Sequence, residues 1–270
     1  MTSWAKRAGE LLEAIREKRP MIHHMTNNVV TNFTANVTLC IGAAPVMAPC
    51  EREVEQMVSY AGALLLNIGT LDDVQVQSML VVGRKARELG VPVVLDPVGA
   101  GATDLRTVAA RTIMEKVKLS VIRGNAGEVF TLAGAGGKVR GVDSMEDVGE
   151  RDAVIAGFAR QEKTVVAVTG PVDVITDGKR VVKVSNGHPI LGQVTGTGCA
   201  ATTVIAAFLA VARDEPLEAT TCALAAMGLA AEFAAEKSAG PGTFVPQLLD
   251  ALAALDAKAL KKGVKIEEVS

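Results

Sequence analysis

The sequence is poor in aromatic residues, which make up 3% of its 270 residues, although 49% of the residues are hydrophobic. Its core must therefore be built from alanine, valine, leucine and isoleucine, a composition typical of helices packed on a largely parallel sheet. The sequence also lacks an excess of charge of either sign, because its net charge is −2 and its isoelectric point is near 6.0. A nucleic-acid-binding protein usually has a strongly basic face. We therefore expect a small-molecule partner and no nucleic acid.

Paired cysteines and export signals are also missing. The four cysteines, at positions 40, 50, 199 and 222, show no Cys-x-x-Cys spacing, which favours reduced thiols over disulfides or a zinc site. Residues 1–20 are charged throughout and contain no apolar core of the signal-peptide type. No clean apolar run reaches the length of about 18 residues that a membrane helix requires. We therefore expect a cytoplasmic protein that does not bind a membrane.

Hydrophobic periodicity predicts strands that alternate with helices. We expect helices at 4–18, 28–41, 72–89 and 104–117, and strands at 21–25, 63–68, 91–96, 119–123 and 164–169. A hairpin is predicted at 172–184, around an Asp-Gly turn, and residues 199 to about 261 are expected to be mostly helical. The pattern predicts an α/β fold with a mainly parallel sheet and helices on both faces. Because no repeat or linker interrupts the chain, one domain over 1–270 is expected.

Four polar residues follow apolar runs at the predicted strand ends, where ligands bind in open parallel sheets. They are Asn67, Asp96, Arg123 and Thr169. Asp96 is followed by Pro-Val-Gly, which must end the strand and expose the carboxylate at the edge of the sheet. An aspartate that only caps the next turn is an equally good interpretation of this position.

Asn125 and Glu128 lie three residues apart at the start of a predicted helix. This spacing is typical of an ordinary helix cap. Together with Asp96, the pair also supplies the oxygen ligands that suit a magnesium ion with most of its water shell intact. Magnesium usually binds together with phosphates, so a magnesium site here would imply a phosphate-bearing ligand. The helix cap and the magnesium site both remain possible interpretations of this pair.

The glycine-rich stretch 192–199 precedes an apolar helical run, and it predicts a tight turn that opens a buried helix. The start of a helix presents free amides and the positive end of the helix dipole, a ready site for an anion. Cys199 falls in the expected first turn, where these groups can lower the pKa of a thiol. Cys199 is therefore a candidate nucleophile or general base, whereas a small hydrophobe closing the turn is the plainer alternative. His23 and His24 do not have helical metal-ligand spacing.

Five motifs in this order resemble the hydroxyethylthiazole kinase family, and the resemblance covers essentially the whole chain. The motifs are Met25-Thr-Asn-Asn-Val, Ala44-Pro-Val-Met-Ala, Leu95-Asp-Pro-Val-Gly-Ala, Arg123-Gly-Asn-Ala-Gly-Glu and Thr195-Gly-Thr-Gly-Cys. The resemblance implies a ribokinase-like fold. Most members of that fold carry an aspartate after the Gly-x-Gly turn, where this sequence has Cys199.

The resemblance also implies roles for the positions selected above. It implies an anion hole for the γ-phosphoryl group at Gly196, Thr197, Gly198 and the Cys199 amide, with Cys199 as general base. It implies magnesium ligands Asp96 and Glu128, ATP contacts from Arg123, Thr169 and Asn125, and a thiazole pocket lined by Asn27, Met47 and Gly196.

The implied reaction is the ATP-dependent phosphorylation of hydroxyethyl-methylthiazole in thiamine salvage, by a homotrimer with sites between subunits. A kinase of the same fold for hydroxymethylpyrimidine or pyridoxal is the nearest alternative. A cysteine hydrolase using Cys199 and one of the three histidines, and a nucleotide-binding regulator without turnover, are alternatives from other classes.

Overall fold

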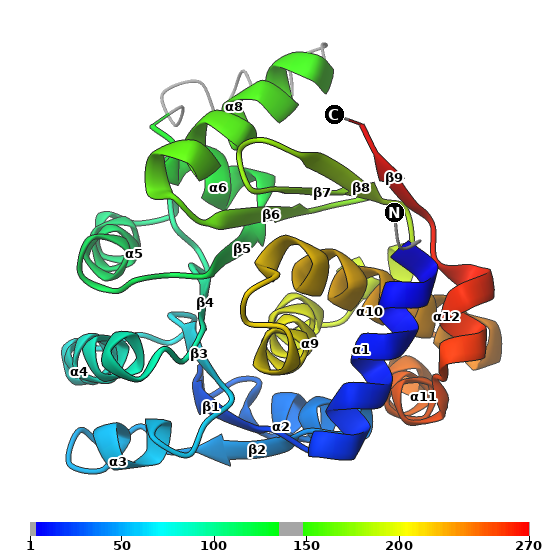
Figure 1. Ribbon diagram of the computed structural model, residues 1–270, viewed down its shortest axis with the longest axis horizontal. Helices are drawn as coiled ribbons and strands as arrows, with labels where there is room; N and C mark the ends of the chain where they lie inside the picture. The colour runs from blue at the N-terminus through cyan, green and yellow to red at the C-terminus, as the bar shows by residue number, and fades with distance from the viewer. Residues whose placement is uncertain (1–3, 135–147, 270) are drawn as a thin grey trace.

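A computed structural model describes residues 4–134 and 148–269, and it shows one sheet between two layers of helices (Figure 1). The described strands, in chain order, are β1 (Met21–Met25), β2 (Ala44–Met47), β3 (Ala63–Asn67), β4 (Val93–Asp96), β5 (Val121–Asn125), β6 (Val165–Thr169), β7 (Asp173–Thr176), β8 (Val181–Val184) and β9 (Ile266–Glu268). Their order across the sheet is β2-β1-β3-β4-β5-β6-β7-β8-β9. The strands from β2 to β6 are parallel, and β7, β8 and β9 add on in antiparallel pairs.

Helices cover both faces of the sheet, which confirms the predicted α/β class. One layer contains α1 (Trp4–Lys18), α2 (Thr31–Ile41), α9 (Thr197–Val211), α10 (Pro216–Lys237), α11 (Pro241–Ala254) and α12 (Ala257–Gly263). The other contains α3 (Val54–Val58), α4 (Asp73–Leu89), α5 (Asp104–Lys116), α6 (Ala126–Leu132) and α8 (Val148–Glu162). A 3₁₀ helix, η2 (Pro189–Gln193), leads into α9.

The alternation of side chains along a strand divides the core in two. In β3, Leu65 packs with the α9 layer, whereas Leu64 and Leu66 pack with the α4 layer. All three side chains are buried, because helices cover both faces of this strand. This is why the strand reads as an unbroken apolar run in the sequence.

The edges of the sheet differ from the sequence prediction. β2 and β9 were not predicted, and the helix expected from residue 28 begins at Thr31. Pro45 lies in β2, which is a strand at the edge of the sheet and pairs only with β1 among the described strands. A proline is tolerated at such an edge because no further strand needs a hydrogen bond from the amide that proline lacks.

Helix α10 is long and apolar enough, by length and composition, to cross a membrane. However, 83% of its apolar window is buried inside the fold, where it packs against α9 and α11. These contacts are those of a core helix.

Candidate active site

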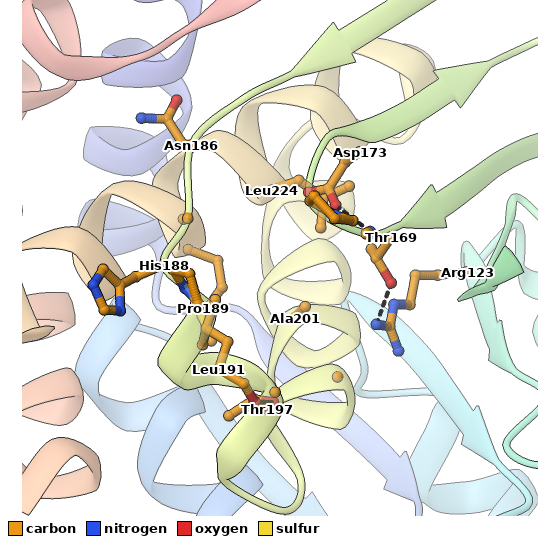
Figure 2. Close-up of a pocket in the computed structure, with 17 residues that line it drawn as sticks. Arg123, Thr169, Asp173, Asn186, His188, Pro189, Leu191, Thr197, Ala201 and Leu224 are labelled. Atoms are coloured by element: carbon orange, nitrogen blue, oxygen red, sulfur yellow. Dashed lines mark hydrogen bonds between the residues drawn. The ribbon is translucent and has the colours of Figure 1, made fainter. Parts of the chain in front are cut away.

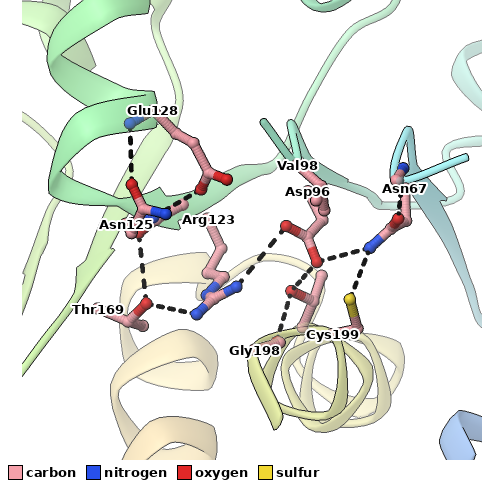
Figure 3. Close-up of polar contacts among 12 residues, drawn as sticks. Asn67, Asp96, Val98, Arg123, Asn125, Glu128, Thr169, Gly198 and Cys199 are labelled. Atoms are coloured by element: carbon pink, nitrogen blue, oxygen red, sulfur yellow. Dashed lines mark hydrogen bonds and ion pairs between the residues drawn. The ribbon is translucent and has the colours of Figure 1, made fainter. Parts of the chain in front are cut away.

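The register of the parallel strands brings the predicted polar residues together at the carboxyl edge of the sheet. Asn67 at the end of β3 pairs with Asp96 at the end of β4, and Asn125 at the end of β5 pairs with Thr169 at the end of β6. The first turn of α9 lies against this edge (Figure 3). Five elements distant in the sequence therefore contribute to one polar cluster.

The start of α9 requires glycine at two positions. Gly196 precedes the helix with φ of 84°, a left-handed conformation, and a side chain there would approach Val30 to 2.6 Å. A side chain at Gly198 would lie 2.7 Å from Nη1 of Arg123. The guanidinium therefore lies directly against the first turn of the helix, whose amides have no carbonyl partner within the helix.

Arg123 connects the two ends of the cluster. Its Nη2 donates a short hydrogen bond to Oγ1 of Thr169, and its Nη1 lies 3.6 Å from Oδ1 of Asp96. Its Nε is buried and has no hydrogen-bond partner among the described residues. The side chain is 11% exposed, so water screens its positive charge only weakly at the start of the helix.

Asp96 is fully buried, and its two oxygens differ. Oδ2 accepts hydrogen bonds from Asn67 at 2.7 Å and from Thr202 at 2.9 Å, whereas the buried Oδ1 accepts none from the described residues. Burial raises the pKa of this carboxyl, against the lowering effect of the Arg123 charge. Apart from its ion pair with Arg123, Oδ1 thus remains available to a further partner.

Cys199 lies beside Asn67 and Asn27, and its sulfur accepts hydrogen bonds from their side-chain amides at 3.2 and 3.6 Å. The expectation that the helix start lowers the pKa of this thiol is wrong in this structure. Burial, and then the nearby charge of Asp96, raise the pKa of Cys199 to about 11, and these effects exceed the lowering by the two amides and by Arg123. Cys199 is therefore a neutral thiol at physiological pH.

Glu128 and Asn125 form a complete capping box at the start of α6. Oδ1 of Asn125 accepts the Glu128 amide at 3.0 Å, and Oε2 of Glu128 accepts the Asn125 amide at 2.8 Å. Oε1 of Glu128 accepts the Gly99 amide, also at 2.8 Å. The two interpretations of this pair are compatible, because each carboxylate oxygen retains a second lone pair that can bind water or a cation.

A magnesium ion fits this cluster only with help from a nucleotide. In residues 4–134 and 148–269, no group of three or more His, Cys, Asp or Glu side chains is arranged to hold a metal alone. Magnesium is commonly bound by one or two carboxylates together with substrate phosphates. Oδ1 of buried Asp96 accepts no hydrogen bond from the described residues, and the Asp96 charge acts on nearby Glu128. This pair of carboxylates fits that mode of binding.

The two residues expected in the thiazole pocket differ in how far the structure connects them to the cluster. Asn27 is buried, and it donates to Oδ1 of Asn67 at 2.8 Å and to Cys199. Met47 lies at the carboxyl end of β2, beside His24 of β1. The Cys199 sulfur forms its hydrogen bonds with Asn27 and Asn67, and Met47 forms none with it.

A cavity of about 500 Å³ opens on the other side of the α9 start (Figure 2). Arg123, Thr169, Thr197 and Gly198 line one end of it. Its other lining residues, none of which the sequence assigned to a nucleotide site, include Asp173, Asn186, His188, Leu191, Leu224, Met227 and Gly228. They come from β7, from η2 and the loop before it, and from α10, and only the folded chain brings these segments together.

Comparison with known proteins identifies the family. The profile of the hydroxyethylthiazole kinase family matches residues 12–258. The chain belongs to the hydroxyethylthiazole kinase family. A hydroxyethylthiazole kinase of Chloroflexus aurantiacus is 52% identical to this chain over 265 residues, which is 98% of each sequence. The resemblance carried by the five motifs is therefore confirmed, and with it the kinase class of the enzyme.

Solved structures agree with this family membership. The hydroxyethylthiazole kinase of Pyrococcus horikoshii superposes with a TM-score of 0.90 at 44% identity, covering 97% of this chain and 99% of that one. A ribokinase-like protein of Enterococcus faecalis superposes with a TM-score of 0.60 at 13% identity, covering 93% of this chain and 89% of that one. This second likeness concerns the fold alone, and it confirms the ribokinase-like architecture.

Proposed function

We propose that this kinase transfers the γ-phosphoryl group of ATP to the primary hydroxyl of hydroxyethyl-methylthiazole. The proposal rests chiefly on one observation: the start of α9 and the Arg123 guanidinium together line one end of the 500 Å³ cavity. Phosphoryl transfer depends on positioning and on charge stabilisation more than on covalent chemistry. A helix start beside a buried arginine supplies both, and family membership supports the thiazole as acceptor.

The nucleotide would occupy the cavity with its triphosphate toward α9. The proposed anion hole at Gly196, Thr197, Gly198 and the Cys199 amide would receive the transferred group. Arg123 and Thr169 would contact the phosphates, with Asn125 nearby at the end of β5. The apolar side chains of Leu224 and Met227, which α10 contributes to the cavity wall, suit a purine base.

Asp96 and Glu128 would hold magnesium, through its water shell. A bound magnesium ion would neutralise charge on the phosphates. The protein's own contribution is to place Asp96 beside Arg123, whose charge favours the ionised carboxylate against the effect of burial, and to fix its Oδ2 through Asn67 and Thr202.

The acceptor would bind on the Cys199 side, against Asn27, Met47 and Gly196. With a pKa of about 11, only a small fraction of Cys199 is thiolate at neutral pH. That thiolate would take up the hydroxyl proton late in the transfer and return to the thiol, so Cys199 would contribute modestly as a general base. A loose transition state tolerates a weak base of this kind, since the attacking oxygen carries little positive charge until the phosphoryl group has nearly left ATP.

The test is ADP release by the purified protein with ATP, magnesium and one alcohol at a time. The alcohols are hydroxyethyl-methylthiazole, hydroxymethylpyrimidine and pyridoxal, and mass spectrometry identifies the phosphorylated product. A signal that depends on the thiazole is expected. A larger kcat/KM for pyrimidine or pyridoxal would assign the enzyme to the alternative acceptor.

A pair of glycine variants tests whether the α9 start is the site. In Gly198→Ala, the new methyl group must displace the Arg123 guanidinium, so turnover should fall and the KM for ATP should rise. In Gly242→Ala, at the start of α11, the methyl group meets no atom within 4 Å, and turnover should be unchanged. Equal activity in the two variants would refute the location.

We also propose that the working form is a homotrimer with the acceptor pocket completed between subunits. The support is that β2, which carries Met47, is an edge strand with every residue only partly buried, and that Val29 and Leu39 are 66% and 54% exposed nearby on the chain. Sedimentation equilibrium should give three times the mass of one chain. A monomer with full activity would overturn this.

A further inference from the structure

Asp173 is a buried carboxylate in the wall of the cavity that the mechanism above does not use. It is the first residue of β7, it is 9% exposed, and it lines the cavity together with Thr169 and Gly170. Figure 2 shows its side chain above Thr169, with Asn186 and His188 on the far side of the cavity. An aspartate in so enclosed a position is costly unless its oxygens have partners.

The hydrogen bonds of Asp173 account for one oxygen only. Oδ1 accepts the Gly170 amide at 3.0 Å, which closes a turn between β6 and β7. Among the described residues the second oxygen accepts no hydrogen bond, and Asp173 forms no salt bridge. Arg123 is the charged group that acts on it electrostatically, while Thr169 holds the Arg123 guanidinium. The second oxygen is therefore available to a ligand in the cavity.

The place of Asp173 along the cavity indicates what that ligand group is. Arg123, Thr169 and Gly198 line the cavity at the start of α9, where the phosphates are proposed to bind. Asn186, which lies against Gly228 of α10, is on the far side of the cavity from Thr169 (Figure 2). Asp173 follows Thr169 by four residues and lies next to the phosphate end (Figure 2). In a nucleoside triphosphate, the group between the phosphates and the base is the ribose.

We propose that Asp173 binds the ribose of the nucleotide by accepting a hydrogen bond from its 2′- or 3′-hydroxyl. This inference rests on the proposed use of ATP in this cavity. A carboxylate is the natural acceptor for a sugar hydroxyl, and acidic residues bind ribose in this way in dinucleotide-binding folds. Contact with a phosphate is excluded by charge, since two negative groups would repel each other in a site of low dielectric. Asp173 thus selects ribonucleotides over deoxyribonucleotides.

The experiment compares ATP with 2′-deoxy-ATP and 3′-deoxy-ATP in the wild type and in Asp173→Asn. Loss of one hydrogen bond to a charged group should lower the wild-type kcat/KM for one of the deoxynucleotides by about 10- to 100-fold. In Asp173→Asn, the preference for ATP should shrink to about 3-fold or less, because the removed hydroxyl no longer has a charged partner. The asparagine keeps an oxygen for the Gly170 amide, so the turn is preserved.

Asp177→Asn is the matched control. Asp177 lies at the other end of β7 and also accepts backbone amides, from Lys179 and Arg180, but it does not line the cavity. Its variant should keep the wild-type preference for ATP. Inosine triphosphate is included because it lacks the amino group of adenine, the other donor that could reach a carboxylate.

Calorimetric binding of ADP and 2′- and 3′-deoxy-ADP separates this proposal from the proposed function. If no alcohol is phosphorylated but Asp173 still discriminates between these diphosphates, the acceptor assignment fails and the ribose assignment stands. Equal use of ATP and both deoxynucleotides by the wild type would overturn the ribose assignment. The assignment would also be overturned if Asp173→Asn kept the wild-type preference for ATP over the deoxynucleotides. The same holds if Asp173→Asn altered only the preference for ATP over inosine triphosphate.

Discussion

Asn67 donates a hydrogen bond to the sulfur of Cys199 across 3.2 Å. The same nitrogen donates to Oδ2 of Asp96 at 2.7 Å, and the Asn67 oxygen accepts from Asn27 and from the Gly69 amide. One fully buried side chain thus holds both the thiol and the carboxylate of the proposed active site. In the proposed reaction, Cys199 would lie toward the acceptor and Asp96 toward magnesium.

Replacement of Asn67 is therefore expected to disturb both sides at once. Asn67→Ala should lower kcat by about 10-fold or more and raise the magnesium requirement, because unpaired buried donors and an unsupported carboxylate remain. Thr202→Val is the matched variant. Thr202 donates a hydrogen bond to the same Oδ2 of Asp96 at 2.9 Å, but it forms none with the Cys199 sulfur. The rate of Cys199 alkylation by iodoacetamide should change in Asn67→Ala and not in Thr202→Val. Equal alkylation rates in all three proteins would refute the link to Cys199.

Cys199→Asp is expected to give a working or faster kinase. A carboxylate, whose ordinary pKa is about 4, is far more available as a base at neutral pH than a thiol with a pKa of about 11. Cys199→Ala should slow turnover without abolishing it, by no more than the 10²- to 10⁴-fold, roughly, that general-base assistance supplies. Steady-state ADP formation measures both effects.

The same replacement carries a pH prediction. The wild-type kcat should keep rising with pH through pH 9, because the fraction of thiolate increases toward the pKa of about 11. The kcat of Cys199→Asp should be level across that range. Intact-mass spectrometry during turnover is the control for covalent chemistry: a Cys199 adduct that forms and decays at the catalytic rate would show that the thiol is a nucleophile.

Arg123→Lys is expected to raise the KM for ATP by about 10-fold or more and to leave the KM for the thiazole nearly unchanged. A guanidinium can bridge two phosphate oxygens, and an ammonium cannot reproduce that geometry. The two constants are measured with the other substrate saturating. Equal increases in both would indicate that Arg123 supports the structure of the whole site, through Thr169 and Asp96, rather than ATP.

Asp96→Asn and Glu128→Gln are expected to raise the magnesium concentration needed for half-maximal rate by roughly 10- to 100-fold. Both changes remove a negative charge and preserve shape, so thermal unfolding should stay cooperative. Asp214→Asn, an exposed carboxylate beyond the far end of α9, is the control and should behave as the wild type. Full activity of both site variants at limiting magnesium would exclude the proposed metal site.

Asp173→Asn is expected to stabilise the protein at alkaline pH. Burial raises the pKa of Asp173 from 3.8 to about 6. The folded state therefore binds this proton more tightly than the unfolded state, and its contribution to stability is present below pH 4 and lost as the pH rises through 6. At pH 8 the variant should melt roughly 2–4 °C above the wild type. That gain should vanish near pH 4, and a gain independent of pH would contradict the assignment.

The sequence alone predicts the central part of this fold. Parallel strands covered on both faces are continuous apolar runs, so β3, β4 and β6 are recognisable from their residues. The polar residue that ends each strand identified Asn67, Asp96 and Thr169, because strand ends in a parallel sheet share one edge. Edge strand β2 escaped detection, since Pro45 argues against a strand unless its place in the sheet is known.

What local sequence determined is the backbone at the site: a glycine turn that opens α9, and a capping box that starts α6 at Asn125. The electrostatics came from the tertiary structure. The helix start alone predicts a lowered pKa for Cys199, but burial and Asp96, distant in the sequence, raise it. Asp173 likewise became a cavity residue only when the β6–β7 turn met α10. Local propensity depends on neighbours along the chain, whereas desolvation and charge depend on neighbours in space, and these are set by packing.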